Sequence, residues 1–294
     1  MPTLMLNDRE VSFETGQTLL EVARENGVQI PTLCHLEGTT PTGACRICVV
    51  EVKGARGLVP SCATPAVDGM EVHTESPRVV EARRVLLNLM LGCGNHNCAV
   101  HCDPGAEWTA RQMAAIENDG EDDLCPAWGD CRLQDLAFRY QAVGTPTQPS
   151  TFPPMEIANP LIVRDFSRCI LCGRCVQACN EVQVNRAISF GYRGSGAKII
   201  AAGDRPLVES DCVFCGECVQ ACPVGALIEK KSRYSWRPWE VRKVRTTCPY
   251  CGVGCQLILE VRDNQIVKIK GDPDGFLNRG YVCHKGRVSA AGRF

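Results

Sequence analysis

Cysteine is the residue type that dominates the possible chemistry of this chain. The sequence has 21 cysteines in 294 residues, and half of the gaps between consecutive cysteines are only two or three residues long. Thiolates at such spacing bind iron–sulfur clusters or zinc. Disulfides are the alternative, but an odd number of cysteines and repeated C-x2-C spacing argue against them. We therefore expect most of the cysteines to be metal ligands.

The most specific pattern is an internal repeat. Residues 169–179 read CILCGRCVQAC and residues 212–223 read CVFCGECVQACP, so both runs have the spacing C-x2-C-x2-C-x3-C. The repeat resembles bacterial two-cluster ferredoxins, in which the fourth cysteine of each run binds the other cluster. The resemblance implies one [4Fe-4S] cluster on Cys169, Cys172, Cys175 and Cys222, and another on Cys212, Cys215, Cys218 and Cys179.

A second cysteine group lies near the N-terminus, with the spacing C-x10-C-x2-C-x13-C: Cys34, Cys45, Cys48 and Cys62. The residues before it predict a hairpin, with strands at Leu4–Leu6 and Val11–Phe13, and a helix opened by a Thr18–Glu21 capping box. This order resembles a β-grasp [2Fe-2S] ferredoxin of the type found in the large iron–sulfur subunit of complex I, iron-only hydrogenases and formate dehydrogenases. A zinc site is the alternative.

A third group begins after a helix that is predicted from Ser76-Pro77 to about Leu91. Its end, CPAWGDCRLQDLA at residues 125–137, resembles the end of the histidine-plus-three-cysteine [4Fe-4S] motif of the same enzymes. The sequence departs from that motif by a charged insertion at residues 103–124. We expect the ligands to be His96, Cys98, Cys125 and Cys131, with His101 or Cys102 as alternatives. Cys93 is expected to be a small buried side chain.

The last group is Cys248, Cys251, Cys255 and Cys283. Strands are predicted at 244–246, 257–261 and 266–269. The pattern resembles the [4Fe-4S] domain of molybdopterin-dependent oxidoreductases, formate dehydrogenases above all. In that family the basic residue two places after the last cysteine, here Lys285, lies between the cluster and the pterin. A four-cysteine zinc ribbon is the alternative.

These elements predict an α+β protein made of several small modules. The modules are a β-grasp [2Fe-2S] ferredoxin (1–75), a small helical His/Cys module (76–142), a proline-rich linker (143–160), a two-cluster [4Fe-4S] ferredoxin (161–232) and a small β-rich [4Fe-4S] domain (242–294). Together they would hold one [2Fe-2S] and four [4Fe-4S] clusters.

The function predicted is electron relay. The sequence has no G-x-G-x-x-G nucleotide fingerprint after a strand, and no catalytic residue can be assigned. The order of modules resembles the α subunits of cytoplasmic NAD-linked formate dehydrogenases. The resemblance implies a flavin/NAD(P)-binding partner, or a ferredoxin, at one end. Molybdopterin, with molybdenum or tungsten, would belong to a partner subunit or to a missing C-terminal part. The alternatives are a truncated formate dehydrogenase catalytic chain and a diaphorase-type subunit of an NAD-linked hydrogenase.

Charge and hydropathy give no reason to expect other partners. The net charge is −1, so no electrostatic footprint for nucleic acid is present. The N-terminal residues lack the basic and apolar regions of a secretory signal, and the most apolar stretch, residues 79–91, is interrupted by charges and too short to span a bilayer. We expect a cytoplasmic protein without membrane insertion.

Overall fold

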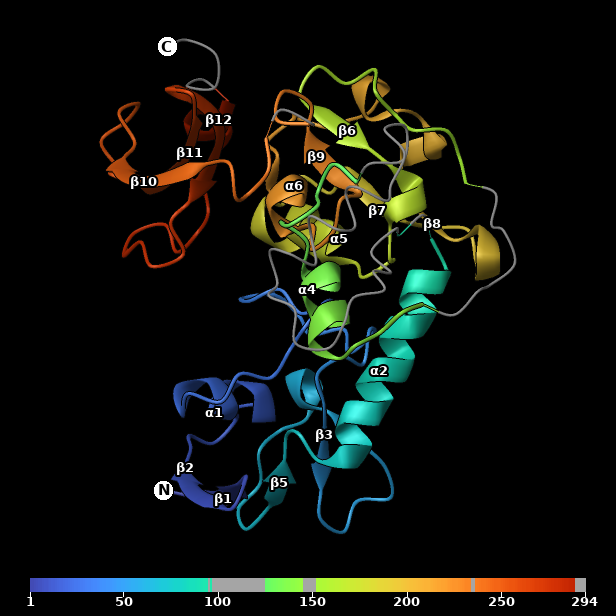
Figure 1. Ribbon diagram of the computed structural model, residues 1–294, viewed down its shortest axis with the longest axis vertical. Helices are drawn as coiled ribbons and strands as arrows, with labels where there is room; N and C mark the ends of the chain where they lie inside the picture. Colours follow the sequence, from blue (N-terminus) through green and yellow to red (C-terminus); the bar gives the residue numbers. More distant parts are fainter. Residues whose placement is uncertain (95, 97–124, 145–151, 234–235, 289–294) are drawn as a thin grey trace. The chain divides into compact units, whose positions relative to one another are not determined.

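The computed structural model describes residues 1–94, 96, 125–144, 152–233 and 236–288 (Figure 1). They divide into two compact units. The first comprises residues 1–101 and 132–150, and the second comprises residues 102–131 and 151–294. Each unit has its own hydrophobic core. The predicted 76–142 module contributes residues to both units.

The first unit contains a mixed five-stranded sheet of order β2-β1-β5-β3-β4. Its strands are β1 (Thr3–Leu6), β2 (Arg9–Ser12), β3 (Val49–Val52), β4 (Val59–Pro60) and β5 (Glu71–His73). β1 is parallel to β5, and the other pairs are antiparallel. The predicted hairpin is confirmed: Asn7 and Asp8 have φ of 49° and 65°, the left-handed values that a two-residue type I′ turn requires.

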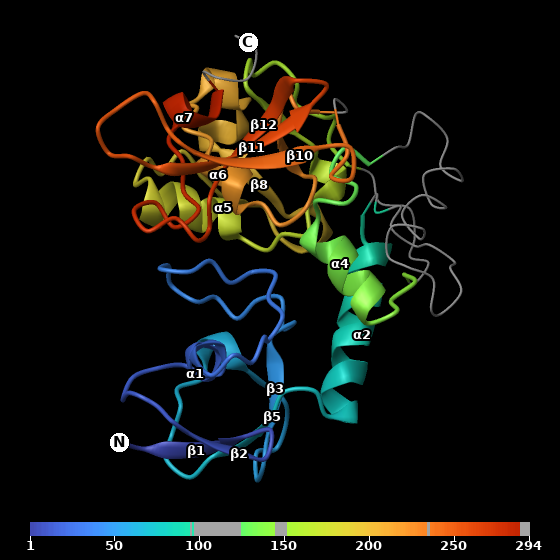
Figure 2. The same cartoon turned by 60° about the vertical axis from the view of Figure 1, so that its left-hand side comes forward.

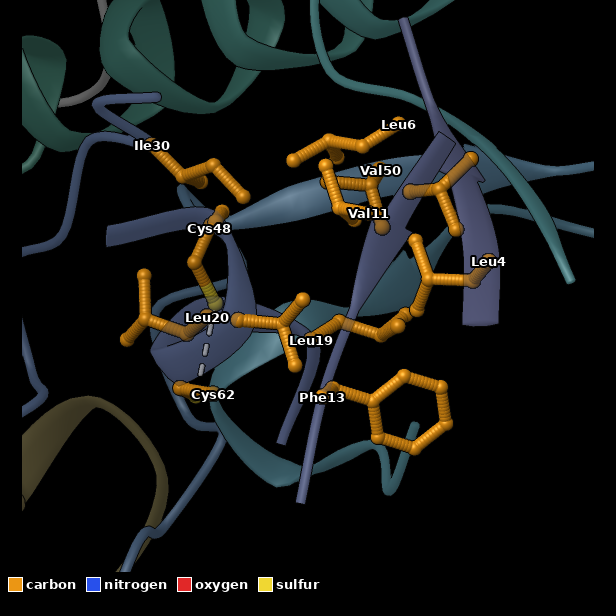
Figure 3. Close-up of a cluster of buried hydrophobic side chains, with 13 residues drawn as sticks. Leu4, Leu6, Val11, Phe13, Leu19, Leu20, Ile30, Cys48, Val50 and Cys62 are labelled. Atoms are coloured by element: carbon orange, nitrogen blue, oxygen red, sulfur yellow. Dashed lines mark hydrogen bonds between the residues drawn. The ribbon is translucent and has the colours of Figure 1, made fainter. Parts of the chain in front are cut away.

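Helix α1 (Leu19–Glu25) lies on one side of this sheet (Figure 2). The predicted capping box is present, because the Thr18 hydroxyl accepts from the Glu21 backbone while the Glu21 carboxylate accepts from the Thr18 backbone. Apolar side chains of the helix and the strands form one core, which also contains two of the cysteines (Figure 3). Its buried members are Leu4, Leu6, Val11, Phe13, Leu19, Leu20, Val22, Ala23, Ile30, Cys48, Val50, Cys62 and Val72.

Two further helices complete the described part of the first unit. α2 (Pro77–Gly92) begins where predicted, with Ser76 as its N-cap and Pro77 as its first residue. α4 (Arg132–Arg139) packs against α2. A short 3₁₀ turn, Ser61–Ala63, carries the last cysteine of the N-terminal group.

In the second unit, two antiparallel strand pairs frame the repeated cysteine runs. They are β6 (Ile162–Arg164) with β9 (Leu227–Glu229), and β7 (Ile188–Gly191) with β8 (Lys198–Ala201). Each cysteine run leads into a short helix: α5 (Arg174–Gln177), continued by a π-helical turn Ala178–Val182, and α6 (Glu217–Ala221). Four 3₁₀ turns lie between these elements: Phe166–Arg168, Gly194–Gly196, Ala202–Asp204 and Leu207–Glu209.

A three-stranded antiparallel sheet follows, of order β10-β11-β12. Its strands are β10 (Arg242–Thr247), β11 (Gln256–Arg262) and β12 (Gln265–Gly271), and the last described helix is α7 (His284–Val288). The three predicted strands are confirmed. Cys248, Leu257, Ile269 and Val282 form the core beneath this sheet. Among the described residues, no helix has the length and apolar character needed to cross a membrane.

Candidate metal centres

The N-terminal cysteines Cys34, Cys45, Cys48 and Cys62 are all buried. They lie on the loop before β3 and on the 3₁₀ turn after β4. The sulfur atoms of Cys48 and Cys62 are 3.3 Å apart (Figure 3). The backbone N–H groups of Cys34 and Cys45 each donate to the sulfur of the other at 3.4 Å. The fold therefore brings the four thiols of this predicted site together as two close pairs.

Hydrogen bonds within each pair of thiols shift the pKa values of the cysteines in this group. The hydrogen bond shared with the Cys45 thiol lowers the pKa of Cys34 to about 5, and the one shared with the Cys62 thiol lowers the pKa of Cys48 to about 6. The same two hydrogen bonds raise the pKa values of Cys45 and Cys62. In each pair, one thiol therefore loses its proton more readily than the other, and the deprotonated thiolate is the form that binds iron.

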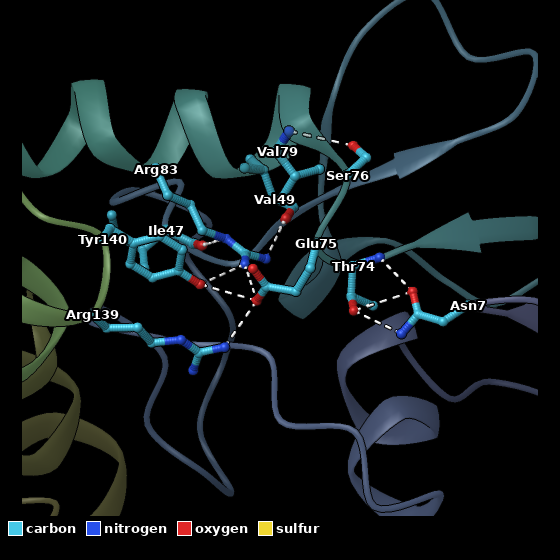
Figure 4. A network of polar contacts seen from close by, with 10 residues as sticks. All are labelled: Asn7, Ile47, Val49, Thr74, Glu75, Ser76, Val79, Arg83, Arg139 and Tyr140. Carbon is cyan, nitrogen blue, oxygen red and sulfur yellow. Dashed lines mark hydrogen bonds and ion pairs between the residues drawn. The ribbon is translucent and has the colours of Figure 1, made fainter. Parts of the chain in front are cut away.

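A buried arginine of α2 supports the loop that carries Cys48 (Figure 4). The Arg83 side chain is fully buried. Its Nε donates to the carbonyl of Ile47 at 2.9 Å, and its Nη2 donates to the carbonyl of Val49 at 2.8 Å. Its Nη1 contacts the Glu75 carboxylate at 2.7 Å and the Tyr140 hydroxyl at 2.8 Å. The guanidinium therefore fixes the backbone on both sides of one cysteine.

The two repeated runs surround one cavity in the second unit. All eight of their cysteines line it: Cys169, Cys172, Cys175, Cys179, Cys212, Cys215, Cys218 and Cys222. Gly173 and Gly216, both with φ of 79°, start the helices that follow, so the chain can bend sharply around the cavity. Burial raises the pKa of Cys169 to about 11 and that of Cys172 to about 12. Buried thiols of this kind lose their protons when a cationic metal is present to compensate the charge.

The two runs differ in charge at one equivalent position. The first run has Arg174 where the second has Glu217, and both side chains are buried. The Arg174 charge acts on the Cys172 and Cys222 thiols, whereas the Glu217 charge acts on the Cys215 thiol. Groups bound at the two ends of the cavity would therefore lie in different electrostatic surroundings.

The terminal cysteines come together at the edge of the β10–β12 sheet. The N–H of Cys248 donates to the carbonyl of Cys255 at 2.8 Å. Burial raises the pKa of Cys255, and the charges of Cys248, Cys251 and Cys283 raise it further. Cys251 and Cys283 are exposed. Lys285 is exposed on α7, two residues after Cys283.

The third predicted site is described in part. Cys125 and Cys131 are buried in the second unit, and the carbonyl of Cys125 accepts from Arg237 at 2.9 Å. His96 belongs to the first unit. Cys98, His101 and Cys102 lie outside the described residues, so the ligand set with His96 stays a prediction. Cys93 corrects one expectation: it is exposed, not buried, because it is the C-cap of α2.

The donor sets fit iron–sulfur clusters in chemistry. Every cysteine in the described ranges has a free thiol. Within those ranges, no three His, Cys, Asp or Glu side chains converge closely enough to hold a single metal ion. Thiolates are the ligands that iron–sulfur clusters take from proteins.

Two supporting arginines were not predicted from the sequence. Arg83 contacts residues more than thirty positions away, and Arg287 donates to the carbonyl of Gly216. Arg83 has no recognisable spacing from Cys48, and nothing in the sequence relates Arg287 to the Cys215 loop. The difference between Arg174 and Glu217, in contrast, is visible when the two runs are aligned.

Comparisons with known proteins identify iron–sulfur domains in three parts of the chain. Three domain families match: a 2Fe-2S iron–sulfur cluster binding domain at residues 1–77, a 4Fe-4S dicluster domain at residues 168–226, and a molybdopterin oxidoreductase Fe4S4 domain at residues 241–291. The chain therefore contains [2Fe-2S] and [4Fe-4S] domains of mixed α/β structure.

Relatives are found among the components of redox complexes. The chain is 33% identical to the G 2 subunit of the NADH-quinone oxidoreductase of Rhizobium meliloti, over 98% of this chain and 31% of the relative. It is 35% identical to the HndD subunit of the NADP-reducing hydrogenase of Solidesulfovibrio fructosivorans, over 80% of this chain and 37% of the relative. It thus spans about a third of the length of these curated relatives.

A solved structure covers most of the chain. A chain in the crystal structure of an NAD⁺-reducing [NiFe]-hydrogenase in the H2-reduced state is 31% identical, with a TM-score of 0.64. The match includes 80% of the present chain and 90% of the hydrogenase chain. The protein therefore belongs to the family of iron–sulfur proteins that includes this hydrogenase chain, and its matching domains are of the [2Fe-2S] and [4Fe-4S] types.

Proposed function

We propose that this chain is a five-cluster electron relay between a flavin/NAD-binding subunit and a molybdopterin site that oxidises or produces formate. The single observation that carries the proposal is the convergence of both cysteine runs on one cavity. A cavity lined by eight thiols is suited to two [4Fe-4S] clusters. The bound clusters supply the one-electron chemistry, and the protein holds them in place, excludes water and adjusts their potentials.

The proposed ligand sets follow the cysteine groups. Cys34, Cys45, Cys48 and Cys62 would hold a [2Fe-2S] cluster in a β-grasp module. The two runs would hold two [4Fe-4S] clusters, with Cys179 and Cys222 exchanged between them. Cys248, Cys251, Cys255 and Cys283 would hold the terminal cluster, and His96, Cys98, Cys125 and Cys131 would hold the remaining one.

The partners proposed for the two ends of the relay rest on separate observations. The match of residues 241–291 to a molybdopterin oxidoreductase Fe4S4 domain supports a pterin beyond the terminal cluster, with Lys285 between the two. That pterin would lie in a partner or in a further part of the polypeptide. Relatives named as subunits of NADH-quinone oxidoreductase and NADP-reducing hydrogenase support a nucleotide-binding partner.

A diaphorase-type subunit of an NAD-linked hydrogenase is the second candidate. The similarity to the NAD⁺-reducing hydrogenase chain favours it, because 90% of that chain is covered. The two candidates differ in what they predict beyond the terminal cysteines, since the hydrogenase candidate needs no molybdenum or tungsten there.

Metal analysis tests both candidates. The chain is purified anaerobically from its own cells, and Fe, Ni, Zn, Mo and W are quantified per chain. We expect about 18 Fe for one [2Fe-2S] and four [4Fe-4S] clusters, with Mo or W co-purifying. About 18 Fe with nickel in place of Mo or W would favour the hydrogenase subunit. About 14 Fe and one zinc would mean a zinc site in place of one [4Fe-4S] cluster and would contradict the five-cluster relay.

A further inference from the structure

The helix that follows the last cysteine is attached to the loop of the second cysteine run. Arg287 of α7 is buried, and its Nη1 donates to the carbonyl of Gly216. Its Nη2 donates to the carbonyl of Val282 at 2.9 Å. One guanidinium therefore joins the residue just before Cys283 to the residue just after Cys215.

A glutamine forms a second bond between the same two segments. The Gln220 side chain of α6 accepts from the N–H of Val282 at 3.1 Å and donates to its carbonyl at 3.2 Å. His284 adds a third contact, with its Nδ1 3.0 Å from the carbonyl of Phe214. The residues on both sides of Cys283 are thus fixed to the loop and helix that carry Cys215 and Cys218.

Packing and charge make this contact specific. A Cβ on Gly216 would collide with the Arg287 guanidinium, so the close approach needs glycine at that position. Cys215, Gly216, His284 and Arg287 line one small cavity, which places a thiol of the second run beside the residue that follows Cys283. Arg287 also pairs with Glu229 at 3.5 Å, so its positive charge is partly balanced within the contact.

We propose that Arg287 and Gln220 are positioning residues that hold Cys283 against the Cys215 loop and so make this contact the electron path between the terminal site and the two-run cavity. The inference rests on the proposed function, because it needs a cluster at each site. Transfer across the contact moves one electron and no proton: the donor site is oxidised by one electron and the acceptor site is reduced by one.

The test measures the magnetic interaction between the two reduced sites. The complete chain, purified anaerobically with its clusters, is reduced with dithionite, and its electron paramagnetic resonance (EPR) spectrum is recorded. A Cys248→Ser chain, which lacks one ligand of the terminal site, identifies the part of the spectrum that depends on that site. Arg287→Met and Gln220→Met remove the contacts, and Arg262→Met is the control, because Arg262 pairs with Glu240 at the far end of β11.

We expect both test variants to keep the wild-type iron content and to lose at least half of the interaction signal. The midpoint potential of the Cys212–Cys215–Cys218 site should fall in Arg287→Met, which removes a positive charge. The control should change neither quantity. An unchanged interaction signal in both test variants overturns the proposal. If Arg287→Met does not retain its iron, the interaction signal of Gln220→Met is used by itself, and an unchanged signal in that variant overturns the proposal.

The wild-type chain separates this inference from the proposed function. About 14 Fe with one zinc contradicts the five-cluster relay and the inference together. About 18 Fe without any interaction signal that depends on Cys248 leaves the relay intact and overturns the inference alone.

Discussion

At the scale of single residues, the most informative difference lies inside the repeated run. The two runs share the sequence C-G-x-C-V-Q-A-C and differ at Arg174 and Glu217 within it. A positive charge near a cluster favours its reduced, more negative state, and a negative charge disfavours it. The repeat therefore predicts two clusters of similar geometry and different potential.

Substitutions at these two positions should move the potentials in opposite directions. Arg174→Gln should lower the potential of the site that contains Cys172, and Glu217→Gln should raise that of the site that contains Cys215. The expected shifts are roughly 60 mV for each 1.4 kcal/mol of lost interaction. An EPR-monitored redox titration measures them, with the exposed Arg205→Gln as control. Shifts of the same sign in both variants would rule out this charge mechanism.

Arg83 carries the second prediction at residue scale. Arg83→Met should destabilise the first unit by roughly 2–4 kcal/mol, because it leaves the carbonyls of Ile47 and Val49 buried without their donors. Denaturant unfolding, followed by the visible circular dichroism of the [2Fe-2S] site, measures the loss. Arg84→Met is the matched control, since Arg84 is exposed and pairs with the exposed Glu81 on the same helix. Equal stabilities of the two variants would refute a supporting role for Arg83.

At the scale of elements, the structure shows how local sequence sets the shape of the first sheet. The β1–β2 turn has two left-handed residues in succession, Asn7 and Asp8. Asn7 is further held by Thr74, whose N–H and hydroxyl both donate to the Asn7 side-chain oxygen (Figure 4). Asp8 also has a left-handed backbone, but its Cβ makes this conformation less favourable than it would be for glycine.

The turn therefore predicts a stabilising substitution. Asp8→Gly should raise the free energy of unfolding by about 0.5–1 kcal/mol, because glycine adopts φ of 65° without strain and Asn-Gly is the preferred type I′ pair. Asp8→Ala should lower it by a similar amount, since alanine is strained at that angle. Thermal unfolding of both variants tests whether glycine raises and alanine lowers the stability relative to the wild type. If alanine stabilised as much as glycine, backbone strain would not be the cause.

At the scale of the whole molecule, the chain is divided into two compact units with separate cores. The [2Fe-2S] candidate lies entirely in the first unit, and both the two-run cavity and the terminal cysteines lie in the second. Units with separate cores need not unfold together.

Unfolding of the cluster-loaded chain should therefore occur in two transitions. We expect the visible signal of the [2Fe-2S] site and the signals of the [4Fe-4S] sites to be lost at different denaturant concentrations. Arg83→Met should move the first transition and leave the second in place. A single transition for all signals, shifted as a whole by that substitution, would show that the units unfold as one.

The sequence by itself determined the chemistry and the local elements. Cysteine spacing depends on ligand geometry, which a few neighbouring residues define, so the repeat and the [2Fe-2S] and [4Fe-4S] domains could be predicted without a structure. The hairpin, the capping box and the start of α2 were equally local, because turn and cap residues act within a few positions.

The tertiary structure alone decided which distant residues support the sites. Arg83 reaches the Cys48 loop across more than thirty positions, and Arg287 reaches Gly216 across seventy-one. Such contacts follow from how helices and loops pack, and packing has no fixed spacing in the sequence. The exposure of Cys93 was missed for the same reason, because its place at the end of α2 depends on which face of the helix the rest of the unit covers.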